Sequence, residues 1–136
     1  MSYNRIMQAD ITEIKADVYD VWKQAVEYFN NISEALQFAE EIERHRFSDQ
    51  ARNSALSTVN HIAKSSHSRT KSELQNFLKE AMDSLEETVA TLLLAKQYRC
   101  LRRDLCDEMY FHGALLAKKI KRIDIDLQDM PRISKN

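Results

Sequence analysis

The apolar residues between Ile11 and Ile42 recur at alternating steps of three and four. Such spacing places them on one face of an α-helix, whereas in a β-strand it would scatter them over both faces. A second apolar row, Trp22, Phe29 and Leu36, lies one residue further along, so the apolar face is wider than the seam of a two-stranded coil. The segment therefore predicts one long helix within a bundle, with the second row in the core or an interface rather than free to stack on nucleic-acid bases. The first row consists of Ile11, Ile14, Val18, Val21, Ala25, Tyr28, Ile32, Ala35, Ala39 and Ile42.

The chain has almost no residues that favour tight β-turns. Among its 136 residues there is one glycine, Gly113, and one proline, Pro131. The hydrophobic share of 43% and the charged share of 30% are typical of a soluble globular protein, and a chain of this length fits one domain with a sizeable core. We therefore expect a single all-α domain over residues 1–136.

The sequence shows no sign of a membrane segment or of an oxidising compartment. No stretch approaches about 18 consecutive apolar residues, and the first residues lack the apolar run of a signal peptide. The two cysteines, Cys100 and Cys106, have neither the number nor the spacing of a disulfide framework or a zinc site. We expect a cytoplasmic protein with two reduced thiols.

Capping signals divide the chain into four helices. Asp10, Ser48, Thr70 and Asp104 each precede an apolar periodic run and are candidate N-caps; Asp10 and Thr70 are each followed by glutamate three residues later, as in a capping box. Short connections between the helices favour an antiparallel up-down-up-down four-helix bundle. The predicted helices cover residues 10–45, 48–65, 71–98 and 103–127, and the polar tail 128–136 is predicted to be disordered.

In this topology the first and third connections lie at one end of the bundle. Basic side chains from both connections meet there, with Phe47 and Tyr98 nearby. Clustered Lys and Arg bind nucleic acid by neutralising phosphates and releasing counterions, and aromatic rings add base stacking. The candidate nucleic-acid site at this end consists of Arg44, Arg46, Lys96, Arg99, Arg102 and Arg103. A second candidate site at the other end consists of Lys64, His67, Arg69 and Lys71.

Residue types and spacings suited to catalysis or metal binding are missing. A di-iron bundle needs Glu-x-x-His pairs, and no histidine here has glutamate three residues before it. Cys106 and His112 are six residues apart, which places them on different helix faces. His112 is more typical of a core boundary, with Gly113 allowing close approach of a neighbouring helix. We predict no enzymatic activity, no catalytic residues, no metal and no cofactor.

Between Phe47 and Glu87 the sequence resembles a known family. Read in order, the segments Gln50–Ser57, His61–Ala63, Arg69–Glu73 and Ser84–Glu87, with Val21-Trp22 upstream, resemble the four-helix bundle proteins encoded by 23S ribosomal RNA intervening sequences. The similarity covers most of residues 17–125 and extends to accessory proteins of diversity-generating retroelements. Ser65 stands where the family has glycine, and Lys64 where it has an acidic residue. The resemblance implies a bacterial protein without enzymatic activity that forms rings of identical subunits, as homopentamers.

The sequence favours two functions, and a third, a small enzyme, remains open only if the fold assembles a polar pocket that residue spacing does not reveal. The first is a homo-oligomeric scaffold or adaptor whose partner is RNA or DNA, structured RNA in particular, bound at the basic end. The alternative is a protein–protein interaction module with no nucleic-acid role. The second is compatible with the segment from Val89 to Ala95, which is apolar nearly all round and predicts burial on several sides, one of them against another subunit.

Overall fold

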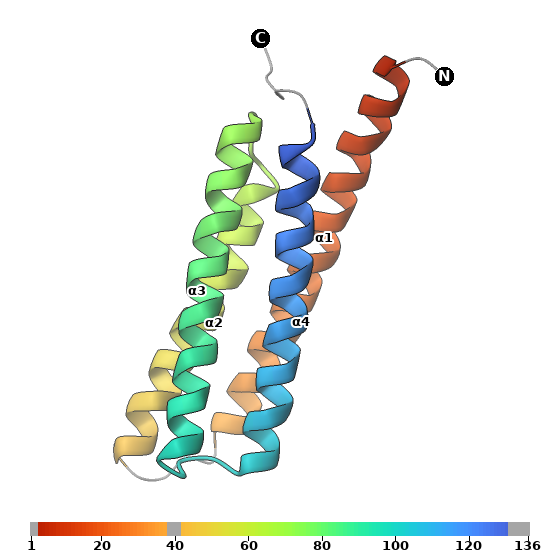
Figure 1. Cartoon of the computed structure of the whole chain (residues 1–136). Helices are drawn as coiled ribbons and strands as arrows, with labels where there is room; N and C mark the ends of the chain where they lie inside the picture. Colours follow the sequence, from red (N-terminus) through yellow and green to blue (C-terminus); the bar gives the residue numbers. More distant parts are fainter. Residues whose placement is uncertain (1–2, 38–41, 131–136) are drawn as a thin grey trace.

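The structure, a computed structural model, describes residues 3–37 and 42–130, with side chains over residues 13–37 and 47–130. Its four helices are α1 (Tyr3–Leu36), α2 (Ile42–Ser65), α3 (Lys71–Gln97) and α4 (Arg103–Gln128), and the described ranges contain no strand. Each helix packs along the next, α1 also packs along α4, and neighbouring helices run in opposite directions (Figure 1). The predicted all-α, antiparallel four-helix bundle is confirmed.

Helix α1 buries the apolar rows that predicted it. Trp22 and Phe29 of the second row pack partly buried against the core, and Leu36 is buried, so this row is core rather than a stacking platform. The buried residues of the first row are Ile14, Val18, Val21, Ala25, Tyr28 and Ile32. Because these side chains are covered by α2 and α4, the wide apolar face accounts for the bundle.

The predicted bounds of the first two helices are wrong. α1 begins at Tyr3, so Asp10 lies inside the helix and does not cap it. It ends at Leu36, and α2 begins at Ile42, so Ser48 is a buried residue within α2. The apolar spacing continues across the break, and no glycine or proline interrupts it. Periodicity therefore carries no mark of the connection, whose residues 38–41 lie outside the described ranges.

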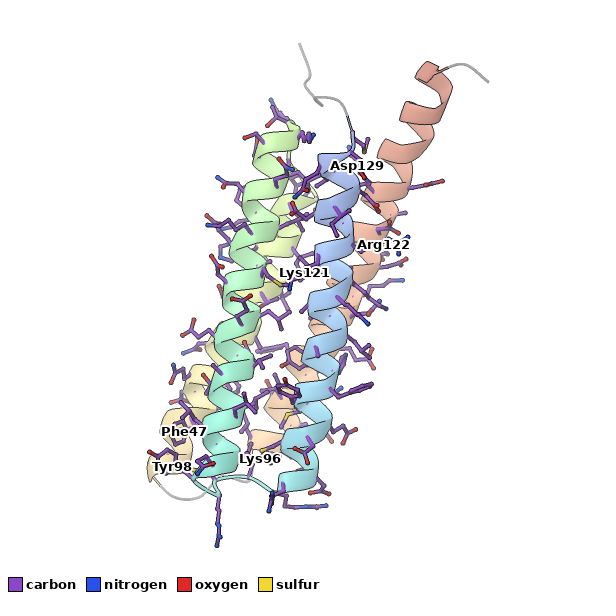
Figure 2. All side chains as sticks on the ribbon, in the orientation of Figure 1. Phe47, Lys96, Tyr98, Lys121, Arg122 and Asp129 are labelled. Atoms are coloured by element: carbon purple, nitrogen blue, oxygen red, sulfur yellow. The ribbon has the colours of Figure 1, made fainter. Side chains whose placement is uncertain are left out.

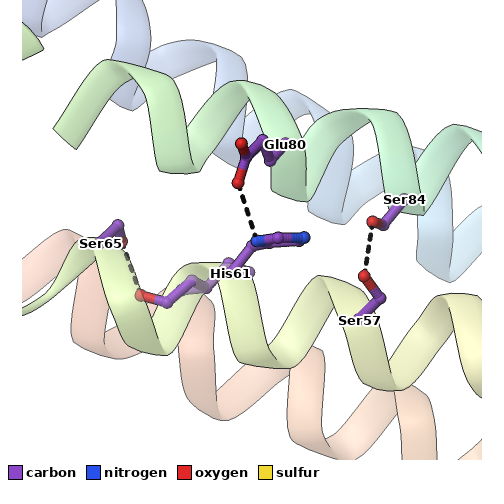
Figure 3. A network of polar contacts seen from close by, with 6 residues as sticks. Ser57, His61, Ser65, Glu80 and Ser84 are labelled. Atoms are coloured by element: carbon purple, nitrogen blue, oxygen red, sulfur yellow. Dashed lines mark hydrogen bonds and ion pairs between the residues drawn. The ribbon is translucent and has the colours of Figure 1, made fainter. Parts of the chain in front are cut away.

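Helices α2 and α3 meet through small side chains. They form the most extensive contact of any helix pair, and Ala55 of α2 and Ala81 of α3 are fully buried in the core. Small residues let two helices approach closely, and polar side chains bridge the two helices. Figure 3 shows the Ser57–Ser84 and His61–Glu80 bridges. The bridges are Thr88 Oγ1 to Ser54 Oγ at 2.7 Å, the Ser57 and Ser84 hydroxyls at 2.9 Å, and His61 Nδ1 beside Glu80 Oε2 at 3.1 Å.

The connection between α2 and α3 is formed without a glycine. The Ser65 hydroxyl donates to the Ile62 carbonyl at 2.6 Å (Figure 3), and Arg99 is the one described non-glycine residue with positive φ. Ser65 therefore does not have the positive φ that favours glycine, so serine can occupy the position at which the family named above has glycine. At the start of α3, Thr70 Oγ1 accepts from the Glu73 backbone N–H at 3.1 Å, which confirms Thr70 as the N-cap.

The two ends of α4 differ from the prediction. Its N-cap is Arg102, which makes no side-chain capping bond, and Asp104 lies in the first turn instead. After Gln128 the chain makes one more turn, in which Met130 is buried and its carbonyl accepts from Lys71 Nζ at 2.6 Å. Residues 128–130 are therefore ordered by an apolar anchor, contrary to the predicted disorder, and residues 131–136 lie outside the described ranges.

Gly113 lets Tyr28 lie directly against α4. A Cβ atom at residue 113 would stand 2.7 Å from the Tyr28 hydroxyl oxygen and 3.0 Å from Val89 Cγ2. The His112 ring meets the Tyr28 ring edge to face, with centroids 5.1 Å apart. The close approach predicted for Gly113 and the core-boundary position predicted for His112 are both confirmed. Burial also raises the pKa of Tyr28, whose hydroxyl has no hydrogen-bond partner among the described residues.

Candidate nucleic-acid interface

The chain connections sort to the two ends of the bundle as the topology predicts. The α3–α4 connection lies at the same end as the break between α1 and α2, and the α2–α3 connection lies at the other end with both termini (Figure 1). Lys96, Tyr98 and Phe47 gather at the first end (Figure 2). The side chains of Arg44 and Arg46 lie outside the described residues, so the described part of the candidate site comes from α3, α4 and the turn between them.

The turn after α3 ends the helix in a left-handed conformation. Arg99 has φ of 55°, its N–H donates to the Lys96 carbonyl at 3.1 Å, and the Cys100 N–H donates to the Ala95 carbonyl at 2.8 Å. These two bonds form a Schellman motif, in which glycine is the usual left-handed residue. An arginine there costs about 1 kcal/mol relative to glycine. The fold thus holds Arg99 exposed in a strained backbone conformation.

Two of the predicted basic residues are already paired with carboxylates. Lys96 Nζ forms an ion pair with Asp107, and Arg102 forms hydrogen bonds to both carboxylate oxygens of Asp104. The Arg102 guanidinium lowers the pKa of the Asp104 carboxyl. These contacts could not be read from the sequence, and they leave Lys96 and Arg102 with less charge to offer a phosphate.

Arg99 and Arg103 remain exposed beside an exposed aromatic ring. Neither makes an ion pair with another described residue. The Tyr98 ring is 65% exposed and stacks on Phe47, with centroids 5.8 Å apart and planes at 19°. Together Tyr98, Arg99 and Arg103 form what we call the α3–α4 turn surface, a small basic patch with an aromatic platform.

The second candidate site lies at the opposite end and is less concentrated. Lys64, His67 and Arg69 are exposed along the end of α2 and the following loop. Lys71 points elsewhere, because its ammonium group donates to the Met130 carbonyl. The structure therefore does not join the two candidate sites, and it takes Lys71 out of the second one.

Apolar side chains are exposed on the outer faces of α3 and α4. The segment from Val89 to Ala95, predicted to be buried on several sides, leaves Leu93 and Leu94 about half exposed. On α4, Phe111 is 65% exposed. Single exposed apolar residues are common, but several on neighbouring helices are typical of an interaction surface. For Leu93 and Leu94, the sequence signal is the segment from Val89 to Ala95, which is apolar nearly all round. For Phe111, no signal was identified in the sequence.

A pocket of about 510 Å³ opens between α1 and α4 and is also lined by Cys100, Leu101 and Arg102 of the α3–α4 connection. Exposed Asn31 and Glu34 of α1 lie at its mouth. Its other lining residues include Ala35, Leu105, Met109 and His112. Mixed apolar and polar lining at this size suits an inserted side chain or a small molecule. The sequence alone does not reveal the pocket, because its lining residues come from segments that are distant in sequence.

The described residues hold no group of three or more histidine, cysteine or acidic side chains arranged to bind a metal ion. No helix in the same ranges is long and apolar enough to cross a membrane. Cys100 and Cys106 are both buried, and no disulfide bond joins them. Burial raises the pKa of the Cys106 thiol, and the Asp107 carboxylate acts in the same direction.

We expect Cys106 to react slowly with thiol reagents at neutral pH, because reaction requires an accessible thiolate. In the folded protein, labelling should be at least about tenfold slower than in urea, as followed by absorbance and assigned by mass spectrometry. A Ser72→Cys variant provides an exposed thiol for comparison. Equal labelling rates at Cys106 and at the introduced cysteine would contradict the buried placement.

Comparisons with other proteins agree with the fold and with the resemblance in the sequence. The structure is similar to a crystal structure of a protein of unknown function from the S23 ribosomal protein family of Bacteroides thetaiotaomicron, with a TM-score of 0.73 and 18% identity over 80% of this chain and 98% of that chain. At this identity the likeness shows the fold alone. No curated protein matches the chain. The family model described as 23S rRNA-intervening sequence protein matches residues 17–122, which span most of the bundle, and the chain belongs to that family.

Proposed function

We propose that the protein is a non-enzymatic, homo-oligomeric scaffold that binds nucleic acid, structured RNA in particular, through the α3–α4 turn surface. The observation that supports this proposal is the left-handed arginine: Arg99 occupies a position where glycine would relieve backbone strain. Strain retained at an exposed position is often associated with function. The Arg99 side chain forms no hydrogen bond or ion pair with the other described residues, and it is exposed to solvent.

Charge and aromatic exposure at the same place strengthen the proposal. Arg99 and Arg103 can each contact a phosphate, and the Tyr98 ring can stack on an unpaired base. The formal net charge of the chain is −1, so one copy has little general attraction for a polyanion. A homo-oligomer repeats the surface, and repeated weak contacts raise the overall affinity.

The test uses Arg99→Gly, which separates binding from folding. We expect weaker binding of a labelled RNA hairpin, with the slope of log affinity against log salt reduced by about one. The same substitution should leave the unfolding midpoint unchanged or higher, because glycine accepts the left-handed conformation. Lys79→Gln, which removes an exposed charge from the middle of α3, serves as the control and should leave the affinity nearly unchanged.

The opposite result is equally clear. If Arg99→Gly combined with Arg103→Gln leaves both the affinity and its salt dependence as in the wild type, the α3–α4 turn surface does not bind nucleic acid. The alternative function, a protein–protein interaction module, is favoured by the exposed apolar residues Leu93 and Phe111. It would then be the better description.

A further inference from the structure

The outer face of α4 has a stripe of its own, in addition to the one that faces the core. Its residues follow steps of four and three, the spacing with which one helix packs along another. Phe111 is 65%, Leu115 42% and Ile125 54% exposed. The stripe, which we call the outer α4 stripe, consists of Phe111, Leu115, Lys118, Arg122 and Ile125, all exposed. Its three apolar residues, separated by the two basic ones, stay exposed within the described part of one copy of the chain.

A complementary row lies on α1. It follows the same alternating spacing and is rich in carboxylates. Lys23 forms an ion pair with Asp20 at 3.5 Å, but no salt bridge links α1 to α4 among the described residues. The row, which we call the acidic α1 row, consists of Glu13, Asp17, Asp20, Gln24, Glu27, Asn31 and Glu34. Its charge is opposite to that of Lys118 and Arg122.

The pocket between α1 and α4 lies at one end of the acidic α1 row, where Asn31 and Glu34 belong to both. Its floor includes Leu105 and Met109. A cavity of about 150 Å³ holds a benzene molecule, so a pocket of about 510 Å³ has room for a phenyl ring. Phe111 is the most exposed apolar side chain of the outer α4 stripe.

The heights of these features along the bundle match. The Tyr28 ring contacts the His112 ring, and Gln24 Oε1 accepts a hydrogen bond from Lys119 Nζ at 2.8 Å. These two contacts show which residues of α1 and α4 lie at the same height along the bundle axis. A rotation about an axis parallel to the bundle leaves each residue at its own height. Phe111 of one copy therefore arrives at the level of Asn31 in the next copy, and Lys118 arrives between the levels of Asp20 and Glu27.

We propose that a second copy of the chain covers the outer α4 stripe. Phe111 enters the pocket between α1 and α4 of the next copy, while Lys118 and Arg122 face that copy's acidic α1 row. Because the two surfaces of the contact differ, each copy both inserts a Phe111 and receives one, and such head-to-tail contacts close into a ring or extend as a filament. This inference rests on the homo-oligomeric part of the proposed function and supplies its interface.

The first experiment measures assembly of the full chain by sedimentation equilibrium. Phe111→Ala should weaken self-association at least about tenfold, since buried aromatic anchors dominate interfaces. Asn31→Trp, which blocks the mouth of the pocket from an exposed position, should have a similar effect. Leu56→Ala removes a side chain that is 42% exposed on α2 and should leave assembly unchanged.

Mixing the two defective variants tests the direction of the contact. Phe111→Ala retains a pocket, and Asn31→Trp retains a phenyl ring, so the mixture should form one-to-one dimers that cannot grow further. Circular dichroism of each variant before mixing verifies that both are folded. Absence of these dimers in a mixture of folded variants would overturn the proposed insertion.

Charge reversal tests the second part of the contact. Lys118→Glu with Arg122→Glu should weaken assembly by placing like charges opposite the acidic α1 row, and adding Asp20→Lys with Glu27→Lys should restore it. Assembly that is indifferent to Phe111→Ala and to both charge sets would overturn this docking geometry while leaving the homo-oligomer standing. A wild-type monomer at micromolar concentration would overturn both, and RNA binding is measured separately.

Discussion

Gly113→Leu should destabilise the protein by about 3 kcal/mol or more. At residue 113 even a Cβ atom would stand 2.7 Å from the Tyr28 hydroxyl oxygen, and Tyr28 is only 1% exposed and has no room to swing away. A leucine would have to push α4 off α1, and forced overpacking of a tight core costs about 1–3 kcal/mol and occasionally more. Urea unfolding at one fixed protein concentration measures the loss, because the proposed self-association would make stability depend on protein concentration.

A neighbouring position provides the matched control. Ala114 is exposed on α4, so Ala114→Leu introduces the same side chain one residue away and should change stability by no more than about 0.5 kcal/mol. If both variants lost the same amount, the close approach of Tyr28 to Gly113 would not be the cause.

The contribution of the Tyr28 hydroxyl to the destabilisation at residue 113 can be measured separately. Gly113→Ala gains helix propensity of about 1 kcal/mol but brings a methyl group against the hydroxyl oxygen. The same substitution made together with Tyr28→Phe should cost less, because the nearest contact then becomes Val89 Cγ2 at 3.0 Å. A double-mutant cycle measures this coupling.

The apolar periodicity was sufficient to predict the helices and the way they pack. Alternating steps of three and four identified the buried face of α1, and Thr70 followed by Glu73 identified the start of α3. Gly113 beside His112 was recognised as a place of close approach. These features are local in sequence, so a local pattern can reveal them.

Several features leave no mark in the apolar pattern of the sequence. The end of α1 at Leu36 is one of them, because the apolar spacing continues past it without a helix-breaking residue. The pairing of Lys96 with Asp107 across two helices is another. The sequence therefore predicts which basic residues lie at this end of the bundle. Only the structure shows that Lys96 is paired with a carboxylate and that Arg99 has a left-handed backbone conformation.

The acidic and basic side chains are distributed unevenly along the chain, and the fold shows where the two kinds of charge lie. Residues 1–50 carry five basic and ten acidic side chains, and the remainder carries fifteen and eleven. The acidic α1 row and the basic residues of α4 lie on adjacent helices, yet no described ion pair joins them. In the proposed contact between copies these charges would face one another, and opposite charges across an interface steer association and fix its register.

The contact between α2 and α3 leads to the last prediction, that Ala55→Leu destabilises the bundle by about 3 kcal/mol. Ala55 is fully buried, and it follows Ser54, whose hydroxyl accepts from Thr88 Oγ1 at 2.7 Å. This hydrogen bond fixes α2 against α3, so α2 cannot shift easily to admit three additional carbon atoms into the core beside Ser54. Moving the helices apart would also break the bridge between Ser57 and Ser84, so the packing penalty and the loss of hydrogen bonds act together.

Asn53 is the matched position for this prediction, because it is exposed two residues earlier on α2. Asn53→Leu adds the same side chain to the same helix and should change the free energy of unfolding by no more than about 0.5 kcal/mol. The two variants are compared by urea unfolding monitored by circular dichroism, again at one protein concentration. A loss below about 0.5 kcal/mol for Ala55→Leu would mean that α2 can move freely, since only a movable α2 could accommodate a leucine in the core at this fully buried position.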